Sequence, residues 1–396
     1  MTVVIIGAGQ AAGQAAASLR QRGYEGAVVV IGDEAHPPYQ RPPLSKQYLA
    51  GESGLDRVYM RPASFYAEKD ITLKTGTRAV ALDLAARTVA TDAGESIGFD
   101  HLLLATGSRP RRLDVPGSDL AGVNYLRTIA DVDAIREAMQ PGRRLVIVGA
   151  GYIGLEVASV AITAGLEVDV LEMQSRVLQR VTTPIMSSYY ERMHSDRGVR
   201  IHTRAAVTAF LGNDRVRQVQ CGDRCFDADL VLVGIGIVPN VELAADAGLA
   251  CDNGILVDEY CRTADPAVYA VGDCCNQPHP LLGRRLRLES VPNALEQARV
   301  AAQNICGAEQ TCSSYPWFWS DQYEHKLQMV GFSADGDEHQ IHGDMDAHKF
   351  AVFYTKDGKV VALDAVNSPR EFMACRQMVA QGVDAATLAA KLGAQS

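Results

Sequence analysis

The chain opens on short, continuous runs of apolar residues rather than on alternating ones. Residues 2–34 read "TVVIIGAGQAAGQAAASLRQRGYEGAVVVIGDE", an apolar run followed by a glycine turn, an Ala-rich stretch and a second apolar run. Residues 143–173 repeat this order as "RRLVIVGAGYIGLEVASVAITAGLEVDVLEM". Continuous apolar runs bounded by glycine are typical of strands buried on both faces of a parallel sheet. Each segment therefore predicts a strand–helix–strand unit.

The pattern changes near residue 316. Residues 317–332, "WFWSDQYEHKLQMVGF", and 349–366, "KFAVFYTKDGKVVALDAV", alternate between apolar and polar positions, as antiparallel strands do. Within the second segment, "KDGK" predicts a hairpin turn. We therefore expect residues 316–396 to form a third, α+β domain.

Two further apolar runs, in residues 99–117 and 228–240, each end in a crossover marked by glycine and proline. The segment "ADPAVYAVGDC" at 264–274 has the same pattern as the first unit, an apolar strand followed by glycine, and is assigned to the first domain. The predicted fold class is α/β, with two Rossmann-like nucleotide-binding domains and a C-terminal α+β domain. The predicted boundaries are 1–110 with 239–315 for a discontinuous first domain, 111–238 for the second, and 316–396 for the third.

The glycine turns carry the first chemical signal. In a GxGxxG turn between a strand and a helix, the first glycine permits the bend, the second lets the backbone approach a pyrophosphate, and the third permits close packing. A lone turn of this kind is weak evidence, but both copies follow an apolar strand, open a helix and lead to an acidic residue at the end of the next strand. The positions are Gly7, Gly9 and Ala12 in the first copy, and Gly149, Gly151 and Gly154 in the second.

The acidic residue after the second turn, Glu172, indicates the type of nucleotide. Its carboxylate would accept hydrogen bonds from a ribose 2′-hydroxyl and would repel a 2′-phosphate, which favours NADH over NADPH. Arg176 lies close in the sequence and leaves the preference less than strict.

Composition and charge exclude several classes of protein. The net charge of −9 argues against a nucleic-acid-binding protein, which would need a basic face. We find neither a signal peptide nor an uninterrupted apolar run of about 18 residues, so we expect no membrane span and a cytoplasmic protein. His339, His342 and His348 have a spacing that matches no metal-site pattern, so no metal is expected.

The cysteines narrow the chemistry further. None of the nine occurs before Cys221, and their spacing does not form a disulfide framework, so they are best interpreted as buried or incidental reduced thiols. Neither glycine turn is followed by a cysteine pair. Disulfide reduction and single-cysteine peroxidase chemistry are therefore not expected.

Motifs along nearly the whole chain resemble one family. The chain is similar to the FAD-dependent NADH:ferredoxin reductases of the putidaredoxin reductase type, within the flavoproteins of the glutathione reductase fold. The resemblance rests on "GAGQAAG", "PYQRPPLSK", "LLLATGSRP", "YLRT", "VIVGAGYIGLEVA", "GIGIVPN", "VYAVGDC", "ESVPNALEQAR" and "PWFWSDQY", in family order. Of these motifs, "PPLSK", "ESVPNALEQAR" and "PWFWSDQY" are much more specific than a glycine turn.

This resemblance assigns FAD to the first domain and NADH to the second. The residues that it implies for FAD are Gly7, Gly9, Ala11, Ala12, Asp33, Lys46, Ala79, Arg127, Asp273 and Val291. Those that it implies for NADH are Gly149, Gly151, Tyr152, Ile153, Gly154, Glu172 and Gly236.

Three residues are implied in catalysis. The resemblance suggests that Lys46 and Glu156 meet beside the N5 edge of the flavin, where the ammonium would stabilise the charge that arrives with hydride and Glu156 would hold it. A structural ion pair that joins two domains is the alternative. Trp319 would, by resemblance, cover the flavin edge that faces the electron acceptor. Trp317, two positions earlier on the same strand face, is better interpreted as a core residue.

The implied function is that of a ferredoxin–NAD(+) reductase in electron transport. Its flavin would accept a hydride from NADH and pass single electrons to a 2Fe–2S ferredoxin. That ferredoxin would serve a cytochrome P450-type monooxygenase or a ring-hydroxylating dioxygenase. The alternative is an NADH-dependent flavoprotein that reduces a small molecule, a quinone or rubredoxin directly. A flavin-bound signalling protein of the same fold would need basic nucleic-acid-binding surfaces, which are not seen.

Ferredoxins are usually acidic, so a local basic docking surface is expected despite the net charge. As a reductase with a transient partner, the protein is expected to be a monomer or a weak homodimer. The candidate docking residues are Arg61, Arg299 and Lys326, with the run of Arg284, Arg285 and Arg287 as further candidates.

Overall fold

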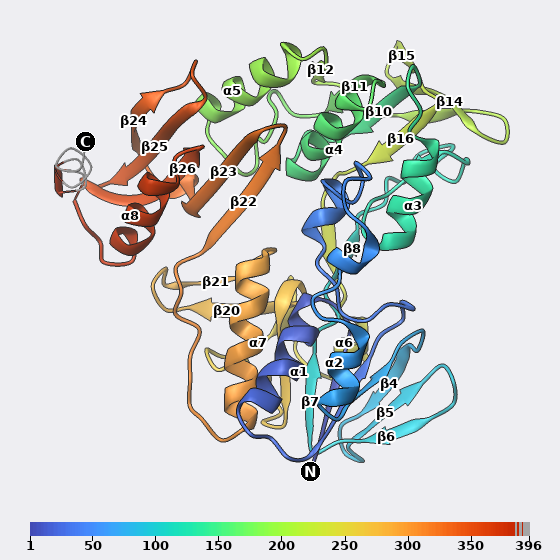
Figure 1. The fold of residues 1–396 in the computed structure, drawn as a ribbon, viewed down its shortest axis with the longest axis vertical. Helices are drawn as coiled ribbons and strands as arrows, with labels where there is room; N and C mark the ends of the chain where they lie inside the picture. Colours follow the sequence, from blue (N-terminus) through green and yellow to red (C-terminus); the bar gives the residue numbers. More distant parts are fainter. Residues whose placement is uncertain (385, 388–389, 391–396) are drawn as a thin grey trace. The chain divides into compact units, whose positions relative to one another are not determined.

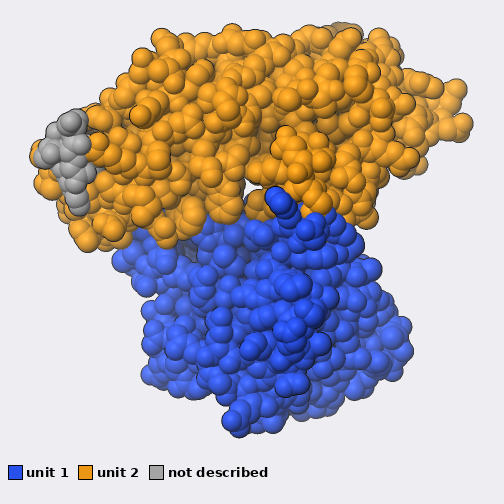
Figure 2. Space-filling model, in the orientation of Figure 1, with its two compact units in different colours: residues 1–41, 55–109, 238–316 blue, residues 42–54, 110–237, 317–396 orange. Residues whose placement is uncertain are grey.

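The computed structural model describes residues 1–384, 386–387 and 390 of the chain. The chain divides into two compact units, which Figure 2 shows in different colours. Unit 1 comprises residues 1–41, 55–109 and 238–316, and unit 2 comprises residues 42–54, 110–237 and 317–396. The short strands β8 (Ser108–Pro110) and β17 (Ile237–Pro239) span two of the boundaries between them.

Unit 1 is built on a five-stranded parallel sheet in the order β19-β7-β1-β2-β3. Helices α1 and α7 pack together (Figure 1) and bury the small side chains of the Ala-rich segment, which allow a close approach. The strands are β1 (Thr2–Ile6), β2 (Ala27–Ile31), β3 (Ile71–Lys74), β7 (His101–Leu104) and β19 (Val268–Ala270), and the helices are α1 (Gln10–Gln21), α2 (Ala63–Glu68), α6 (Glu242–Asp246) and α7 (Val291–Ile305).

Smaller elements complete unit 1. One is a three-stranded antiparallel sheet, and another is a hairpin joined to one further strand. The bounds are β4 (Ala79–Asp83), β5 (Thr88–Thr91), β6 (Ser96–Gly98), β18 (Ile255–Leu256), β20 (Cys275–His279) and β21 (Arg284–Leu286), with 3-10 turns η2 (Leu55–Arg57) and η3 (Gly272–Cys274).

Unit 2 contains a second five-stranded parallel sheet, in the order β12-β11-β10-β16-β9. Between β12 and β16 the chain forms a small antiparallel sheet of three strands, in the order β13-β14-β15. The predicted repeat of the strand–helix–strand unit is therefore confirmed. The bounds are β9 (Val123–Asn124), α3 (Ile129–Ala138), β10 (Arg144–Val148), α4 (Tyr152–Thr163), β11 (Glu167–Glu172), α5 (Pro184–Ser195), β12 (Arg200–Thr203), β13 (Ala209–Gly212), β14 (Val216–Cys221), β15 (Arg224–Asp227) and β16 (Leu230–Val233).

The C-terminal part of unit 2 is an antiparallel sheet, as the alternating pattern predicts, in the order β22-β23-β26-β25-β24 with helix α8. Asp357 and Gly358 have φ values of 51° and 74°. Positive φ at both central residues is what a two-residue hairpin turn requires, so the turn in "KDGK" forms. The bounds are β22 (Trp317–Gln322), β23 (His325–Gly331), η4 (Ser333–Asp335), β24 (Glu338–Asp344), β25 (Lys349–Lys356), β26 (Lys359–Val366) and α8 (Pro369–Val379).

The segment 42–54 follows the first nucleotide-binding motif in the sequence but belongs to unit 2. It contains the 3-10 turn η1 (Pro42–Ser45). The hydroxyl of Tyr48 donates a hydrogen bond of 2.8 Å to Asp133 on α3, which ties the segment to this unit. Lys46 and its motif are thereby placed beside α4 rather than in the sheet of unit 1.

A buried acid lies between α5 and the C-terminal sheet. Asp364 on β26 is 4% exposed, and its Oδ2 accepts hydrogen bonds from Thr182 (2.8 Å) and Tyr354 (2.9 Å). Burial raises the pKa of Asp364 to about 6 from its ordinary value of 3.8, against the two hydrogen bonds, which lower it. The folded protein therefore holds this proton over a pH range in which the unfolded chain has lost it.

This shift makes a prediction about stability. Because the pKa is raised on folding, the stabilisation from protonated Asp364 is complete below about pH 4 and is lost as the pH rises through 6. The loss amounts to about 3 kcal/mol of the free energy of unfolding. Asp364→Asn, which cannot ionise, should remove this decline. The measurement is urea unfolding of both proteins at pH 4.5 and 7.5. An unchanged difference between the two pH values would contradict the prediction.

No helix in the described part of the chain combines the length and the apolar character that crossing a membrane requires.

Candidate active site

The first glycine turn joins β1 to α1 in unit 1. Gly7 has a φ of +105°, and a Cβ at this position would lie 2.1 Å from the carbonyl oxygen of Ala105. Only glycine fits there. At Gly9 the situation is the reverse, because a Cβ would meet no described atom within 4 Å. The turn thus leaves open space at the helix N-terminus, where a nucleotide phosphate can approach the backbone. Ala12 is fully buried at the third position of the motif.

The second turn, between β10 and α4, has the same construction. Gly149 has a φ of +102°, and its Cβ would lie 2.5 Å from the carbonyl oxygen of Gly234. A Cβ at Gly154 would lie 2.3 Å from the carbonyl oxygen of Gly149, which explains the intact third glycine. At Gly151 a Cβ would again meet nothing within 4 Å. Both turns therefore fit a phosphate-bearing ligand.

The acidic residues that follow the turns are placed differently. Glu172, at the end of β11, accepts N–H hydrogen bonds of 2.8 Å from Ala150 and Gln174, so its carboxylate lies at the second glycine turn. Arg176 donates to Ser187 and to the carbonyl of Gln179. Its guanidinium is thus bonded to α5 and to the segment before that helix. Because these bonds already use the cation that could pair with a 2′-phosphate, they support the preference for a ribose 2′-hydroxyl.

In unit 1, Asp33 forms an exposed ion pair with Arg78 (3.1 Å). The next residue, Glu34, is less exposed and is held by Arg41 and by the hydroxyl of Tyr39 (2.7 Å). Glu34 is therefore a second candidate for the nucleotide ribose. The sequence offered both acids at the end of this strand, and only their side-chain contacts distinguish them.

Three of the other residues implied for FAD lie near helix ends in unit 1. Ala11 is in the first turn of α1, Val291 opens α7 after the N-cap Ser290, and Asp273 lies in η3. The carboxylate of Asp273 accepts a 2.8 Å hydrogen bond from Ser108. Ala79 begins β4 in the same unit, whereas Arg127 lies in unit 2 before the capped N-terminus of α3.

Lys46 and Glu156 form a buried ion pair within unit 2. The ammonium nitrogen lies 2.6 Å from Glu156 Oε2, and the side chains are 11% and 2% exposed. Two serine hydroxyls, which the sequence did not single out, also donate to this carboxylate. Ser45 lies 2.5 Å from Oε2, and Ser320 lies 2.6 Å from Oε1. The carboxylate is thus satisfied on both oxygens, as a buried charge requires.

Tyr152 opens α4 and is half-buried. Its hydroxyl is 2.9 Å from the sulfur of Met329, and its ring is 5.3 Å from that of Phe318 on β22. Burial raises the pKa of Tyr152 well above its ordinary value, so it is neutral. The nearby candidate Ile153 is exposed, and Gly236 has a φ of +109° beyond β16.

Trp317 and Trp319 share one face of β22, as their spacing predicts, with ring centroids 5.7 Å apart. Trp317 also packs against Phe372 of α8 and lies under the guanidinium of Arg376. Trp317 therefore packs against α8 but is not fully buried. Both tryptophans are half-buried.

Comparison with known proteins places the chain in a family. The model of the family described as pyridine nucleotide-disulphide oxidoreductase matches residues 1–298. The chain belongs to this family. A second model, described as reductase C-terminal, matches residues 317–392. Membership confirms the predicted α/β fold class, an oxidoreductase activity, and the cofactors FAD and NAD(H) that the family implies.

The most similar relatives identify the branch of the pyridine nucleotide-disulphide oxidoreductases. Rhodocoxin reductase of Rhodococcus erythropolis is 44% identical, over 96% of this chain and 90% of its own length. Putidaredoxin reductase of Pseudomonas putida is 43% identical, over 95% and 91%. A chain in the crystal structure of the covalent putidaredoxin reductase–putidaredoxin complex matches with a TM-score of 0.95 at 42% identity, over 98% and 95%. The predicted resemblance to the ferredoxin reductases is confirmed.

The thiols of this pyridine nucleotide-disulphide oxidoreductase do not form a redox pair at the glycine turns. Helices α1 and α4 contain no cysteine, and all nine cysteines are free thiols. Cys261 and Cys312 are in contact at 3.6 Å, but both are buried. Among the described residues, no three His, Cys, Asp or Glu side chains gather in a way that could hold a metal ion.

The candidate docking residues are distributed over both units. Arg299 is exposed on α7, and Arg61 lies over the ring of Phe65. Lys326 is exposed on β23 and lies 3.6 Å from Asp321. Within the run of arginines, Arg285 donates to the carbonyls of Val257 and Asn276. Arg287 pairs with Glu289 and donates to the carbonyl of Asp273.

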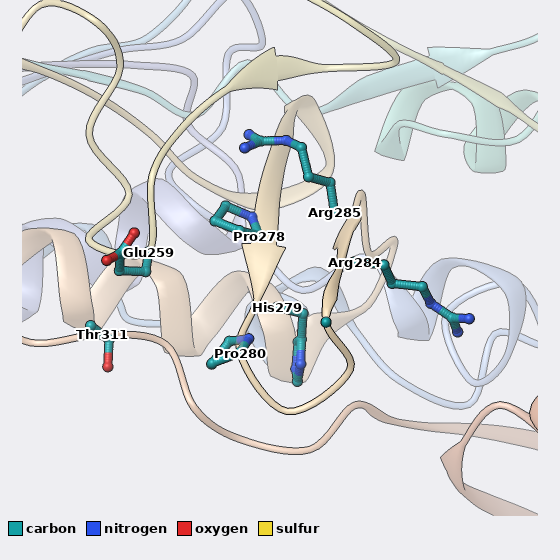
Figure 3. Close-up of a pocket in the computed structure, with 8 residues that line it drawn as sticks. Glu259, Pro278, His279, Pro280, Arg284, Arg285 and Thr311 are labelled. Atoms are coloured by element: carbon teal, nitrogen blue, oxygen red, sulfur yellow. The ribbon is translucent and has the colours of Figure 1, made fainter.

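A pocket of about 480 Å³ lies at the β20–β21 hairpin of unit 1. Figure 3 shows the side chains of Arg284 and Arg285 pointing to opposite sides of the hairpin, as neighbouring strand residues do. His279, between two prolines of this pocket, donates from Nε2 to the carbonyl oxygen of Ser314 (3.2 Å). None of the residues that line this pocket belongs to a glycine turn or to the Lys46–Glu156 pair.

Proposed function

We propose that this protein is a ferredoxin–NAD(+) reductase that passes electrons from NADH through FAD to a 2Fe–2S ferredoxin. The ferredoxin would serve a cytochrome P450-type monooxygenase or a ring-hydroxylating dioxygenase. The observation that carries this proposal is the buried Lys46–Glu156 ion pair beside a nucleotide-binding turn whose helix contains no thiol. The family relatives are named after rhodocoxin and putidaredoxin, and one of them is crystallised in covalent complex with putidaredoxin.

The pyrophosphate of each nucleotide would be held at one glycine turn. In unit 1, the open space at Gly9 and the N-terminus of α1 suit the pyrophosphate of FAD, with Asp273 as an acceptor for a hydroxyl of the ribityl chain. In unit 2, Gly151 and α4 suit the pyrophosphate of NADH, and Glu172 suits its ribose.

Lys46 would supply a fixed positive charge where the flavin becomes negative. FAD, when bound, accepts two electrons as hydride and releases them one at a time. The ammonium of Lys46 is held in place by Glu156 and needs no reorganisation when that charge develops, which is the condition for effective electrostatic catalysis. Trp319 on β22 is proposed to lie on the path to the acceptor.

Docking of an acidic ferredoxin would use exposed basic residues, with Arg299 as the first candidate. Arg299→Glu should slow ferredoxin-dependent cytochrome c reduction about tenfold at low ionic strength, and the effect should shrink as salt is added. Reduction of ferricyanide, which needs no docking, should not change. Arg22→Glu, which reverses another exposed arginine of unit 1, is the matched control. Parallel losses of both activities in Arg299→Glu would contradict a docking role.

The proposed function itself is tested with the purified, FAD-loaded protein. NADH-driven cytochrome c reduction is measured with and without a catalytic amount of 2Fe–2S ferredoxin. A large, saturable increase is expected, because only the ferredoxin couples the flavin to the haem. If several ferredoxins give no increase while a quinone, a small radical or rubredoxin supports steady NADH oxidation, direct reduction of such an acceptor is the function instead. A monomeric or weakly dimeric state and a cytoplasmic location stay predictions of the sequence.

A further inference from the structure

Glu156 on α4 is held by groups from two distant parts of the chain. Its Oε2 accepts from Lys46 (2.6 Å) and Ser45 (2.5 Å), and its Oε1 accepts from Ser320 (2.6 Å). Glu156 and Ser45 are each 1% exposed, and Ser320 is fully buried. The segment 42–54, helix α4 and strand β22 of the C-terminal sheet therefore meet at a single carboxylate.

Beyond Ser320, the hydrogen bonds continue in one direction. Ser320 Oγ lies 3.2 Å from Gln322 Nε2, Gln322 Oε1 lies 2.8 Å from His194 Nε2, and His194 Nδ1 lies 3.0 Å from the hydroxyl of Tyr323. Ser320 and Gln322 thus link Glu156 to His194 at the end of α5, and Tyr323 is the last member of the chain. Gln322 is 1% exposed and His194 is fully buried, so water does not replace these contacts.

The carboxylate determines the direction of every bond. An ionised carboxylate only accepts, so Ser320 donates to it and must accept from the amide of Gln322. The amide oxygen of Gln322 then faces His194 Nε2, which must carry a proton. His194 Nδ1 is left to accept from Tyr323. Burial lowers the pKa of His194 to about 4, so the ring is neutral and can take this role.

We propose that Ser320 is a positioning residue for hydride transfer, whose hydroxyl, supported by Gln322 and His194, donates to the charged form of the Glu156 carboxylate and keeps it directed at Lys46. Hydrogen bonds that all point toward one anion polarise each other and strengthen the last bond of the chain. Ser45 does the same for the other oxygen. This inference rests on one step of the proposed function, the reduction of the flavin by NADH. It does not depend on which molecule then accepts the electrons from the flavin.

Of the other titratable groups near Glu156, all but one keep their charge state across the neutral range. Tyr190 on α5 is buried and Tyr152 on α4 is half-buried, and desolvation raises the pKa of each well above its ordinary value, so both stay neutral. Lys46 is the paired cation. Asp364 on β26 is the exception, since its pKa is raised to about 6. A control variant must therefore leave Asp364 unchanged.

Ser159 on α4 provides that control. It is also buried, and its hydroxyl donates a 2.7 Å hydrogen bond to the backbone carbonyl of Glu156 instead of its carboxylate. Ser159→Ala thus removes a buried hydroxyl from the same helix without touching the charge. Ser320→Ala removes the donor to Oε1, so Glu156 should take up a proton more readily and lose its hold on Lys46.

The test is anaerobic reduction of the FAD-loaded protein by NADH, followed by stopped-flow absorbance from pH 6 to 8.5. The rate deficit of Ser320→Ala relative to the wild type should be about tenfold greater at pH 6 than at pH 8.5, with the KM for NADH unchanged. Ser159→Ala should show a deficit that is the same at both pH values. Ser320→Thr, which retains the hydroxyl, should restore the wild-type profile.

A second readout does not involve turnover. The loss of thermal stability in Ser320→Ala should be larger at pH 8.5 than at pH 6, because a missing donor is costly only while the carboxylate is charged. In Ser159→Ala the loss should not depend on pH. If Ser320→Ala does not fold, Ser45→Ala removes the donor to the other oxygen and should show the same two dependences.

A pH-independent deficit in Ser320→Ala and Ser45→Ala, equal to that of Ser159→Ala, would overturn the proposal and leave these serines with a packing role. This outcome is separate from a failure of the proposed function, which would appear as a missing response to ferredoxin while reduction of the flavin by NADH still shows the predicted pH profile.

Discussion

Replacing Lys46 with methionine is expected to lower the rate of flavin reduction by NADH about 100-fold, the size of effect that follows removal of one preorganised group that stabilises developing charge. It should also lower the free energy of unfolding by about 3 kcal/mol, because Glu156 is then a buried charge without its counterion. The rate is measured by anaerobic stopped flow and the stability by urea unfolding of the same FAD-loaded protein.

A double variant separates the two roles of this pair. In Lys46→Met with Glu156→Gln, no buried charge is left, and the Gln side chain can still bond the hydroxyls of Ser45 and Ser320. We expect most of the stability to return while the rate of flavin reduction stays low. A double variant that reduces its flavin as fast as the wild type would show that the pair is only a structural ion pair.

Replacing Gly151 with valine is expected to raise the KM for NADH about 100-fold without loss of bound FAD, since the side chain would occupy the approach of the pyrophosphate to the helix N-terminus. Gly151 has φ −79° and ψ 178°, a backbone conformation that any residue adopts, and its Cβ would meet nothing within 4 Å. The thermal stability should therefore change little. Steady-state kinetics with varied NADH and the absorbance of bound flavin are the measurements.

Two further glycine variants set the limits of this experiment. Gly151→Ala adds only one methyl group and should raise the KM less than valine does. Gly149→Ala should fail to fold, because this position has a φ of +102° and its Cβ would lie 2.5 Å from the carbonyl oxygen of Gly234. An unchanged KM in Gly151→Val would show that NADH does not bind at the second turn.

The family, the fold class and the two nucleotide turns could be predicted from the sequence because they depend on local signals. A continuous apolar run, a glycine turn and an acidic strand end lie within about 30 residues of each other in each copy, so short-range rules suffice. The same holds for the hairpin at Asp357 and Gly358, where local backbone preference determines the turn.

The surroundings of Glu156 could not be predicted in this way. Ser45 and Ser320 stand in the motifs "PPLSK" and "PWFWSDQY", but no local pattern shows that their hydroxyls donate to the Glu156 carboxylate while that of Ser159 donates to the backbone. The choice between Asp33 and Glu34 has the same difficulty, because it depends on Arg41, Tyr39 and Arg78.

The sequence by itself determined that this protein has two phosphate-binding turns, because such a turn is made by consecutive residues with set backbone preferences. The family motifs then implied FAD for the first turn and NADH for the second. Only the tertiary structure decided how the charge at the centre of the site is held. A buried carboxylate is stable only when both of its oxygens find donors, and the donors to Glu156 come from residues 45, 46 and 320, which the fold alone brings together.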